Sequence, residues 1–186
     1  MPGTHSYADV VSQRKNKVVV FGDSIIRRIN RKEFNQHLKS SRAYIKYFPG
    51  ATADEIDCYT EPTIKKMKPD TVILHVGTND IRRRGGENKA ALIADDIIKV
   101  GLNCKARGVK NIVISSITCR RNEYENKLIA DVNNRVKSYC EAENFVFIHN
   151  ASITQSQLWD DGLHLNDEGV AVLANTFINF LNYYKF

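Results

Sequence analysis

The sequence predicts an α/β protein: a three-layer αβα sandwich around a five-stranded parallel sheet. Two observations lead to this prediction. Five short runs rich in Val, Ile, Phe and Tyr alternate with longer segments whose apolar residues recur at helical spacing. Short apolar runs of this kind are typical of strands buried on both faces of a parallel sheet. Helices that connect successive parallel strands then cover the two faces of that sheet.

The expected elements follow one another along the chain. The strands are Lys17–Phe21, Ala43–Phe48, Thr71–Val76, Asn111–Ser115 and Phe145–His149. The helices are Ile25–Leu38, Thr52–Met67, Glu87–Arg107, Asn122–Glu143 and Asp167–Tyr184. Pro62 lies inside the second helix and predicts a break or a restart there, because proline lacks the N–H that a helix interior needs.

Length and composition favour one domain with a full hydrophobic core. We expect residues 1–16 to form a flexible N-terminal linker and residues 17–186 to form the folded domain. The first seventeen residues are polar, without a hydrophobic signal segment, and no apolar run approaches the about 20 residues of a membrane helix. None of the cysteines shows Cys-x-x-Cys spacing: Cys58, Cys104, Cys119 and Cys140. We expect all of them to be buried free thiols, which fits a reducing, cytoplasmic location.

Polar motifs follow four of the predicted strands. Gly22-Asp23-Ser24 follows the first strand and Gly50 the second. Gly77-Thr78-Asn79-Asp80 follows the third, and an irregular segment with Asp161 and His164 follows the fifth. Because the carboxyl ends of parallel strands share one edge of a sheet, we expect these motifs to converge.

Acyl transfer needs residues of these types. A serine hydroxyl becomes a good nucleophile only beside a base, and His164 can be that base because histidine titrates near neutral pH. Asp161, three residues before it, can orient the imidazole. The N–H groups of Ser24 and Gly50 and the side-chain amide of Asn79 can stabilise an oxyanion.

Other polar residues of the motifs receive structural interpretations. Asp23 is expected to cap the turn after the first strand, and Asp80 to cap or brace its own turn. No His, Cys or acidic cluster has the spacing of metal ligands, so we predict no metal and no cofactor.

The order and spacing of these motifs over about 140 residues resemble the SGNH (GDSL-type) hydrolase family. The resemblance implies a flavodoxin-like sheet and a serine esterase. It places the nucleophile on Ser24, the oxyanion donors on Ser24, Gly50 and Asn79, and the Asp–His pair on Asp161 and His164. Ile25 departs from the leucine that is frequent in the family's first motif, and this exchange is conservative.

A narrower resemblance comes from the segments around these motifs: Ser-Tyr-Ala-Asp-Val-Val, Val-Phe-Gly-Asp-Ser-Ile-Ile-Arg-Arg, Ile-Leu-His-Val-Gly-Thr-Asn-Asp-Ile and Asp-Gly-Leu-His-Leu-Asn. They are similar to the esterase domain of the first-reading-frame protein of LINE-type retrotransposons. This resemblance implies a small ester or lipid-like substrate. It also implies a parent protein that binds RNA and self-associates through segments outside this chain.

The formal net charge of +6 favours anionic partners. Basic residues are expected near the active edge of the sheet, where they form either a solvated face or a rim that binds an anionic membrane surface or RNA: Arg27, Arg28, Arg82, Arg83 and Arg84. Arg31, Lys32 and the pair Arg120-Arg121 are expected to belong to the same basic surface.

The short intervals between motifs leave no room for a large lid, so we expect an open site that favours short acyl groups, acetyl above all. Two alternatives remain. The scaffold could serve as a membrane- or RNA-binding module, or the enzyme could remove acetyl groups from carbohydrate with Trp159 as a stacking surface.

Overall fold

The computed structural model describes residues 14–184 and confirms the predicted α/β architecture. All five strands run parallel in one sheet, in the order β2-β1-β3-β4-β5. This is the flavodoxin-like strand order. The strands lie within two residues of their predicted bounds: β1 Asn16–Gly22, β2 Ser41–Tyr47, β3 Thr71–His75, β4 Asn111–Ser115 and β5 Val146–Ile148.

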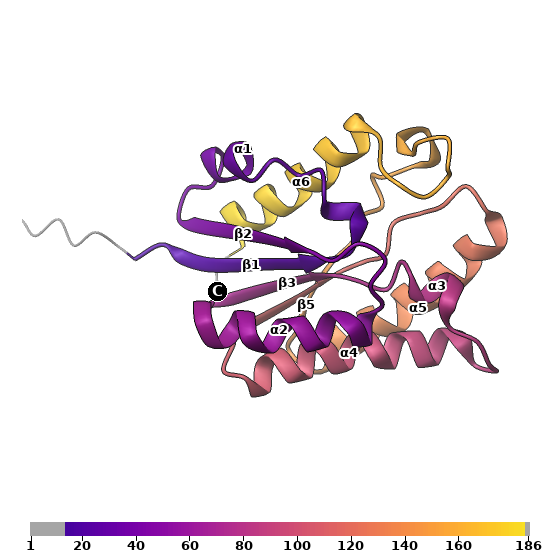
Figure 1. The fold of residues 1–186 in the computed structure, drawn as a ribbon, viewed down its shortest axis with the longest axis horizontal. Coiled ribbons are helices and arrows are strands. Elements are labelled where there is room, and N and C mark those ends of the chain that lie inside the picture. Colours follow the sequence, from indigo (N-terminus) through magenta and orange to yellow (C-terminus); the bar gives the residue numbers. More distant parts are fainter. Residues whose placement is uncertain (1–13, 185–186) are drawn as a thin grey trace, which may run out of the picture.

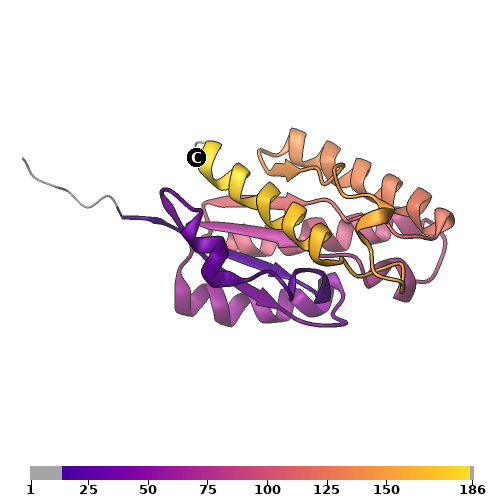
Figure 2. The ribbon, with the colours of Figure 1, turned by 90° about the horizontal axis from the view of Figure 1, so that it is seen from above.

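Helices cover both faces of the sheet and complete the three layers (Figures 1 and 2). One face carries α1 (Arg31–Gln36) and α6 (Asp167–Tyr183), and the other carries α2 (Ala53–Met67), α4 (Lys89–Ala106) and α5 (Glu123–Ala142). Strand β1 contributes to both cores, because Val18 and Val20 face α1 and α6 whereas Val19 and Phe21 face the opposite layer. The short α3 (Asp80–Arg83) and two 3₁₀ turns, Ser24–Ile26 and Gln155–Gln157, lie in the loops.

The predicted boundary between linker and domain differs slightly from the structure. Strand β1 begins at Asn16, one residue before the predicted start of the folded domain, because Asn16 still pairs with Ser41 of β2. Residues 1–13 of the predicted linker lie outside the described residues.

The prediction of one helix over Ile25–Leu38 is wrong. The chain instead forms a 3₁₀ turn at Ser24–Ile26, and the helix α1 begins only at Arg31. Asn30 causes the interruption, because its backbone is extended and its side chain accepts hydrogen bonds from the N–H groups of Lys32 and Glu33. A short amide side chain of this kind competes with helical hydrogen bonds and favours a cap.

The predicted break at Pro62 is also wrong, because α2 continues through it to Met67. The helix is held from both sides of the proline. Thr52 and Glu55 form a capping box at its first turn, and Ile56 and Ile64 bury its apolar face. Pro62 is exposed, so the carbonyl that loses its helical partner can be hydrated.

The cysteines are free, but they are not all buried as expected. Cys104 and Cys140 lie in the core, Cys119 is half-buried, and Cys58 is exposed on the solvent side of α2. Helical position explains the error, since Cys58 lies on the face opposite Ile56 and Ile64. Within residues 14–184, none of the helices combines the length and the apolar character needed to cross a bilayer.

Candidate active site

Ser24 lies directly beyond the carboxyl end of β1, the strand between β2 and β3. The strand ends at Gly22, where a Cβ would come within 2.7 Å of the His75 carbonyl oxygen and 2.8 Å of Ile26 Cδ1. The next residue, Asp23, caps the 3₁₀ turn as predicted, since its carboxylate accepts a hydrogen bond of 2.9 Å from the N–H of Ile25. This cap fixes the backbone of Ser24 at the edge of the sheet.

The segment with Asp161 and His164 is a loop that is held by hydrogen bonds along its length. Leu158 and Leu165 form an antiparallel bridge at its base. Within the loop, the N–H of Trp159 donates to the carbonyl of His164 at 2.8 Å, and the Arg121 guanidinium donates to the carbonyl of Asp160 at 2.9 Å. These bonds explain how a stretch without helical or strand periodicity holds one conformation.

The structure brings Ser24, His164 and Asp161 together in one chain of hydrogen bonds. Ser24 Oγ lies 2.9 Å from His164 Nε2, and His164 Nδ1 lies 2.7 Å from Asp161 Oδ2. The other carboxylate oxygen, Asp161 Oδ1, accepts from the N–H groups of Leu163 and His164, each at 2.9 Å. Burial would raise the pKa of Asp161, but the hydrogen bonds from His164 and the two N–H groups outweigh it and lower the pKa to about 2. Asp161 is therefore a carboxylate at any physiological pH.

The predicted oxyanion donors face the same space. Gly50 adopts a φ of +78°, a conformation that glycine reaches without strain. Among the described residues, the N–H groups of Ser24 and Gly50 have no acceptor, so both are free for a ligand. The Asn79 side chain donates one N–H to the carbonyl of Ala51 at 2.9 Å, which joins the Asn79 loop to the Gly50 loop and leaves its second N–H available.

All of these groups border one open hollow of about 600 Å³ at the carboxyl edge of the sheet. Ser24 and His164 line it together with Arg28 and Trp159. The guanidinium carbon of Arg28 lies 5.5 Å from the centroid of the Trp159 ring. The size is typical of a small-ligand site. The carboxylate and imidazole remain 49% and 40% exposed, so the hollow is wet and shallow.

Two buried charges beneath the hollow hold its loops. Asp80 braces more than its own turn, because its carboxylate accepts from the N–H of Ala53 at the start of α2. Arg120 is 1% exposed and donates to the carbonyl of Thr78 and, at 3.1 Å, to Glu125. The expectation that Arg120 belongs to the basic surface is wrong. A lone Arg-Arg pair in the sequence gives no signal of this burial, because the carbonyl of Thr78 is brought to Arg120 only by the fold.

Asp23 is the most unusual of the buried acids. It is completely buried, and within residues 14–184 its Oδ2 has no hydrogen-bond partner. Burial, followed by the neighbouring Asp80, raises the pKa of Asp23 to about 7. In the unfolded chain this carboxyl ionises near its ordinary pKa of 3.8. Folded protein therefore binds more protons than unfolded protein between these two values, and its stability falls as the pH rises through that window.

Asp23→Asn should remove this pH dependence while keeping the cap, because an amide oxygen also accepts from the N–H of Ile25. Between pH 4 and pH 8, the pKa shift of Asp23 should lower the free energy of unfolding of the parent by on the order of 4 kcal/mol. The variant should not show this loss. Urea unfolding at both pH values measures it. Asp95→Asn, on the exposed side of α4, is the matched control. Equal pH dependence in parent and Asp23→Asn would contradict the assignment.

The basic residues expected at this edge are largely paired with acids. Arg28 pairs with Asp167, and the three arginines after Asn79 pair with acids of other helices: Arg82 with Glu125 at 3.0 Å, Arg83 with Glu55 at 3.0 Å and Arg84 with Asp96 at 3.2 Å. Arg27 and Arg28 border the hollow. Binding of an anionic surface by these arginines stays a prediction. Within the described chain, no group of three or more His, Cys, Asp or Glu side chains is placed to hold a metal ion.

A parallel sheet in this strand order, with a hydroxyl, an imidazole and a carboxylate at its carboxyl edge, defines the SGNH hydrolase fold, a class of carboxylic ester hydrolases. The chain belongs to the GDSL-like lipase/acylhydrolase family, whose model matches residues 20–172. It is accordingly a carboxylic ester hydrolase.

Solved structures share this fold at low sequence identity. A member of the lipolytic G-D-S-L family from Veillonella parvula is 16% identical with a TM-score of 0.76, over 90% of this chain and 99% of that chain. A catalytic mutant of an acetylxylan esterase from Geobacillus stearothermophilus is 18% identical with a TM-score of 0.74, over 91% and 95%. A GDSL-like lipase from Bacteroides thetaiotaomicron is 17% identical with a TM-score of 0.72, over 89% and 87%. A comparison with curated protein sequences found no match.

Proposed function

We propose that this hydrolase is a serine esterase that uses Ser24 as nucleophile, His164 as base and Asp161 as the group that orients the imidazole. The observation that carries the proposal is the unbroken chain of hydrogen bonds from Ser24 Oγ through both ring nitrogens of His164 to Asp161 Oδ2. The roles follow from chemistry, because a hydroxyl in contact with an imidazole loses its proton as it attacks a carbonyl.

The reaction proceeds in two halves. Ser24 Oγ attacks the ester carbonyl while His164 Nε2 takes its proton, and the N–H groups of Ser24, Gly50 and Asn79 stabilise the oxyanion. His164 then gives the proton to the departing alcohol. Water hydrolyses the acyl-enzyme by the same steps, with His164 again accepting a proton. Asp161 stays ionised throughout because its pKa is about 2.

The shape of the hollow supports short acyl groups, with acetyl preferred. The hollow is open to solvent and does not form a closed channel. Its walls combine polar groups with short stretches of apolar surface. A longer acyl chain would stay hydrated and would not gain the about 0.8 kcal/mol that each buried CH₂ contributes. The substrate class that fits is an acetyl ester of a small or lipid-like alcohol.

A chain-length series of p-nitrophenyl esters tests this preference. We expect kcat/KM to be highest for the acetate and to fall about tenfold or more by the octanoate, since the open hollow leaves most of a long acyl chain in water. The leaving group is constant in the series, so the acyl group alone is varied. A kcat/KM that rises from acetate to octanoate would contradict the open site.

A carbohydrate O-acetylesterase is the second candidate. Trp159 favours it, because this side chain is 46% exposed and borders the hollow beside Asp161. The acetylxylan esterase from Geobacillus stearothermophilus shares the fold. Acetate release from acetylated xylan, compared with release from an acetylated glycerolipid, separates the two substrate classes.

The larger setting of the domain is also a proposal. We propose that it belongs to a cytoplasmic, retrotransposon-encoded protein of the LINE type, which binds RNA and self-associates through other segments. The motifs around Ser24, Asn79 and His164 support this, together with Ser-Tyr-Ala-Asp-Val-Val at residues 6–11, which lie outside the described residues.

A further inference from the structure

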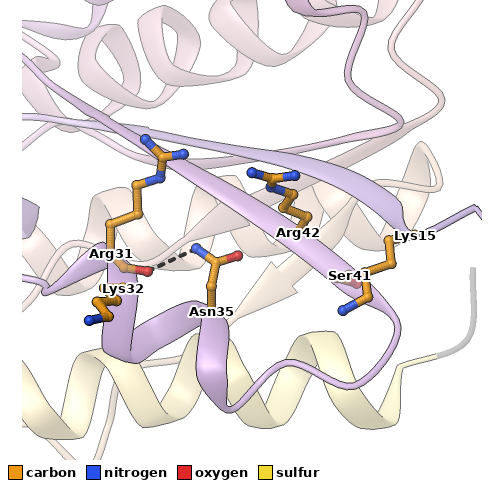
Figure 3. A pocket seen from close by; sticks show the side chains of 6 residues that line it. All are labelled: Lys15, Arg31, Lys32, Asn35, Ser41 and Arg42. Atoms are coloured by element: carbon orange, nitrogen blue, oxygen red, sulfur yellow. Dashed lines mark hydrogen bonds between the residues drawn. The ribbon is translucent and has the colours of Figure 1, made fainter.

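A second hollow, of about 680 Å³, lies beside the amino-terminal ends of β1 and β2 and the helix α1 (Figure 3). Six polar residues line it, and four of them are cationic: Lys15, Arg31, Lys32, Asn35, Ser41 and Arg42. We call this hollow the basic recess. Ser41 pairs with Asn16 at the first position of the β1–β2 ladder, whereas Ser24 follows the last. The two hollows are therefore separated by the length of β1, about 20 Å.

The cations of the basic recess differ from the arginines near Ser24. None of the four forms an ion pair with a carboxylate of residues 14–184, whereas Arg28, Arg82, Arg83 and Arg84 all do. Among the described residues, no acid lines the recess. Concave walls that carry charge of one sign concentrate the electrostatic potential. This recess is therefore a favourable place for an anion.

The recess is held in shape by hydrogen bonds between α1 and β2. The Asn35 amide accepts from the N–H of Ala43 at 2.8 Å and donates to its carbonyl at 2.9 Å. It also donates to the carbonyl of Arg31 at 2.8 Å, as Figure 3 shows. This side chain satisfies the backbone of Ala43 on the free edge of β2 and fixes the helix that carries Arg31 and Lys32 beside the strand that carries Arg42.

Tyr44 positions the two guanidinium groups. The guanidinium carbon of Arg31 lies 4.7 Å from the centre of the Tyr44 ring, and that of Arg42 lies 5.7 Å from it. Cation–π contacts of this kind restrict the rotamers of both arginines. In Figure 3 the two guanidinium groups lie on the same side of β2. Planar guanidinium groups held in place suit the oxygen atoms of a phosphate group.

The chemistry around the recess distinguishes among phosphate-bearing ligands. Within residues 14–184, no apolar side chain lines it, so the recess lacks the protruding apolar groups that enter a bilayer. A cation and an aromatic ring continue this line along the edge strand, because Tyr44 and Lys46 follow Arg42 on the same strand face. A line of cations that runs past an aromatic ring is typical of proteins that bind single-stranded nucleic acid.

We propose that the basic recess binds the phosphodiester backbone of single-stranded nucleic acid, independently of the esterase site. Arg31 and Arg42 contact phosphate oxygen atoms, and Lys15 and Lys32 add electrostatic attraction. From there the nucleic-acid chain continues along the edge of β2. Such binding does not require base-specific contacts, and it depends steeply on salt.

Fluorescence anisotropy with a labelled oligothymidylate of about 12 nucleotides tests the proposal. Arg31→Gln/Arg42→Gln should weaken binding about tenfold at low salt and reduce the slope of log Kd against log salt by about 1.4, because each phosphate that is no longer neutralised lowers the slope by about 0.7. Lys65→Gln/Lys66→Gln removes the same charge from the exposed end of α2 and should leave both values nearly unchanged. Lys15→Gln/Lys32→Gln is a second recess pair, and it should also weaken binding.

Three outcomes would overturn the proposal. Equal weakening by the recess and α2 pairs would mean that net charge alone attracts the strand. Full displacement by tripolyphosphate at equal phosphate concentration would assign the recess to a free polyphosphate. If Arg31→Gln/Arg42→Gln no longer sedimented with phosphatidylserine vesicles but still bound the oligonucleotide, the recess would be assigned to a lipid surface. Thermal unfolding confirms that each variant is folded before the comparison.

Discussion

Ser24→Ala is expected to lower kcat/KM for p-nitrophenyl acetate by about 10⁴-fold or more, the size of effect seen when a nucleophile of this kind is removed. The fold should survive, because the only side-chain hydrogen bond of Ser24 in the described structure is to His164. The cap of the turn comes from Asp23 instead. We therefore expect the free energy of unfolding to change by less than about 1 kcal/mol.

Ser152→Ala is a suitable control for this variant. Ser152 is exposed in the loop after β5, and its side chain makes no hydrogen bond within residues 14–184. It should keep parental activity. If Ser24→Ala, folded and pure, kept more than about a hundredth of the parental kcat/KM, another residue would have to be the nucleophile.

Asp161→Asn is expected to lower kcat about 10³- to 10⁴-fold with little change in fold. The reason lies in the two oxygen atoms of Asp161. Oδ1 accepts from the N–H groups of Leu163 and His164, so an asparagine keeps its oxygen there and turns its NH₂ group toward His164 Nδ1. This amide donates to Nδ1 and leaves the ring proton on Nε2, where it blocks proton transfer from Ser24.

Asp160→Asn removes the same charge one residue earlier, from an exposed side chain, and should leave kcat within about twofold of the parent. Steady-state hydrolysis of p-nitrophenyl acetate measures both variants. Near-parental kcat in Asp161→Asn would show that the carboxylate does not set the tautomer of His164.

The sheet, and the edge at which Ser24, His164 and Asp161 meet, were predictable because their signals are local. Each strand is a short apolar run, and all five occur within two residues of the predicted bounds. Ser24, Gly50, Asn79, Asp161 and His164 each follow a strand, and parallel topology requires the carboxyl ends of the strands to meet at one edge. No pairwise contact had to be known for this prediction.

The errors at the site concern contacts that sequence patterns do not specify. Arg120 is buried because Thr78, 42 residues away, and the nearby Glu125 accept its hydrogen bonds, and the contact with Thr78 forms only in the fold. The charges of Arg83 and Arg84 are offset by acids on α2 and α4. The basic recess also escaped prediction, because it combines residues of three segments that only the packing of α1 against β2 brings together.

Covalent labelling is the most direct test of the claim that Ser24 is an activated nucleophile. A fluorophosphonate probe followed by peptide mapping should place the adduct on the peptide that contains Ser24, because the hydroxyl in contact with His164 attacks phosphorus as it attacks a carbonyl. Labelling should disappear in Ser24→Ala and persist in Ser152→Ala. An adduct on a different residue, or none at all on the folded parent, would contradict the account.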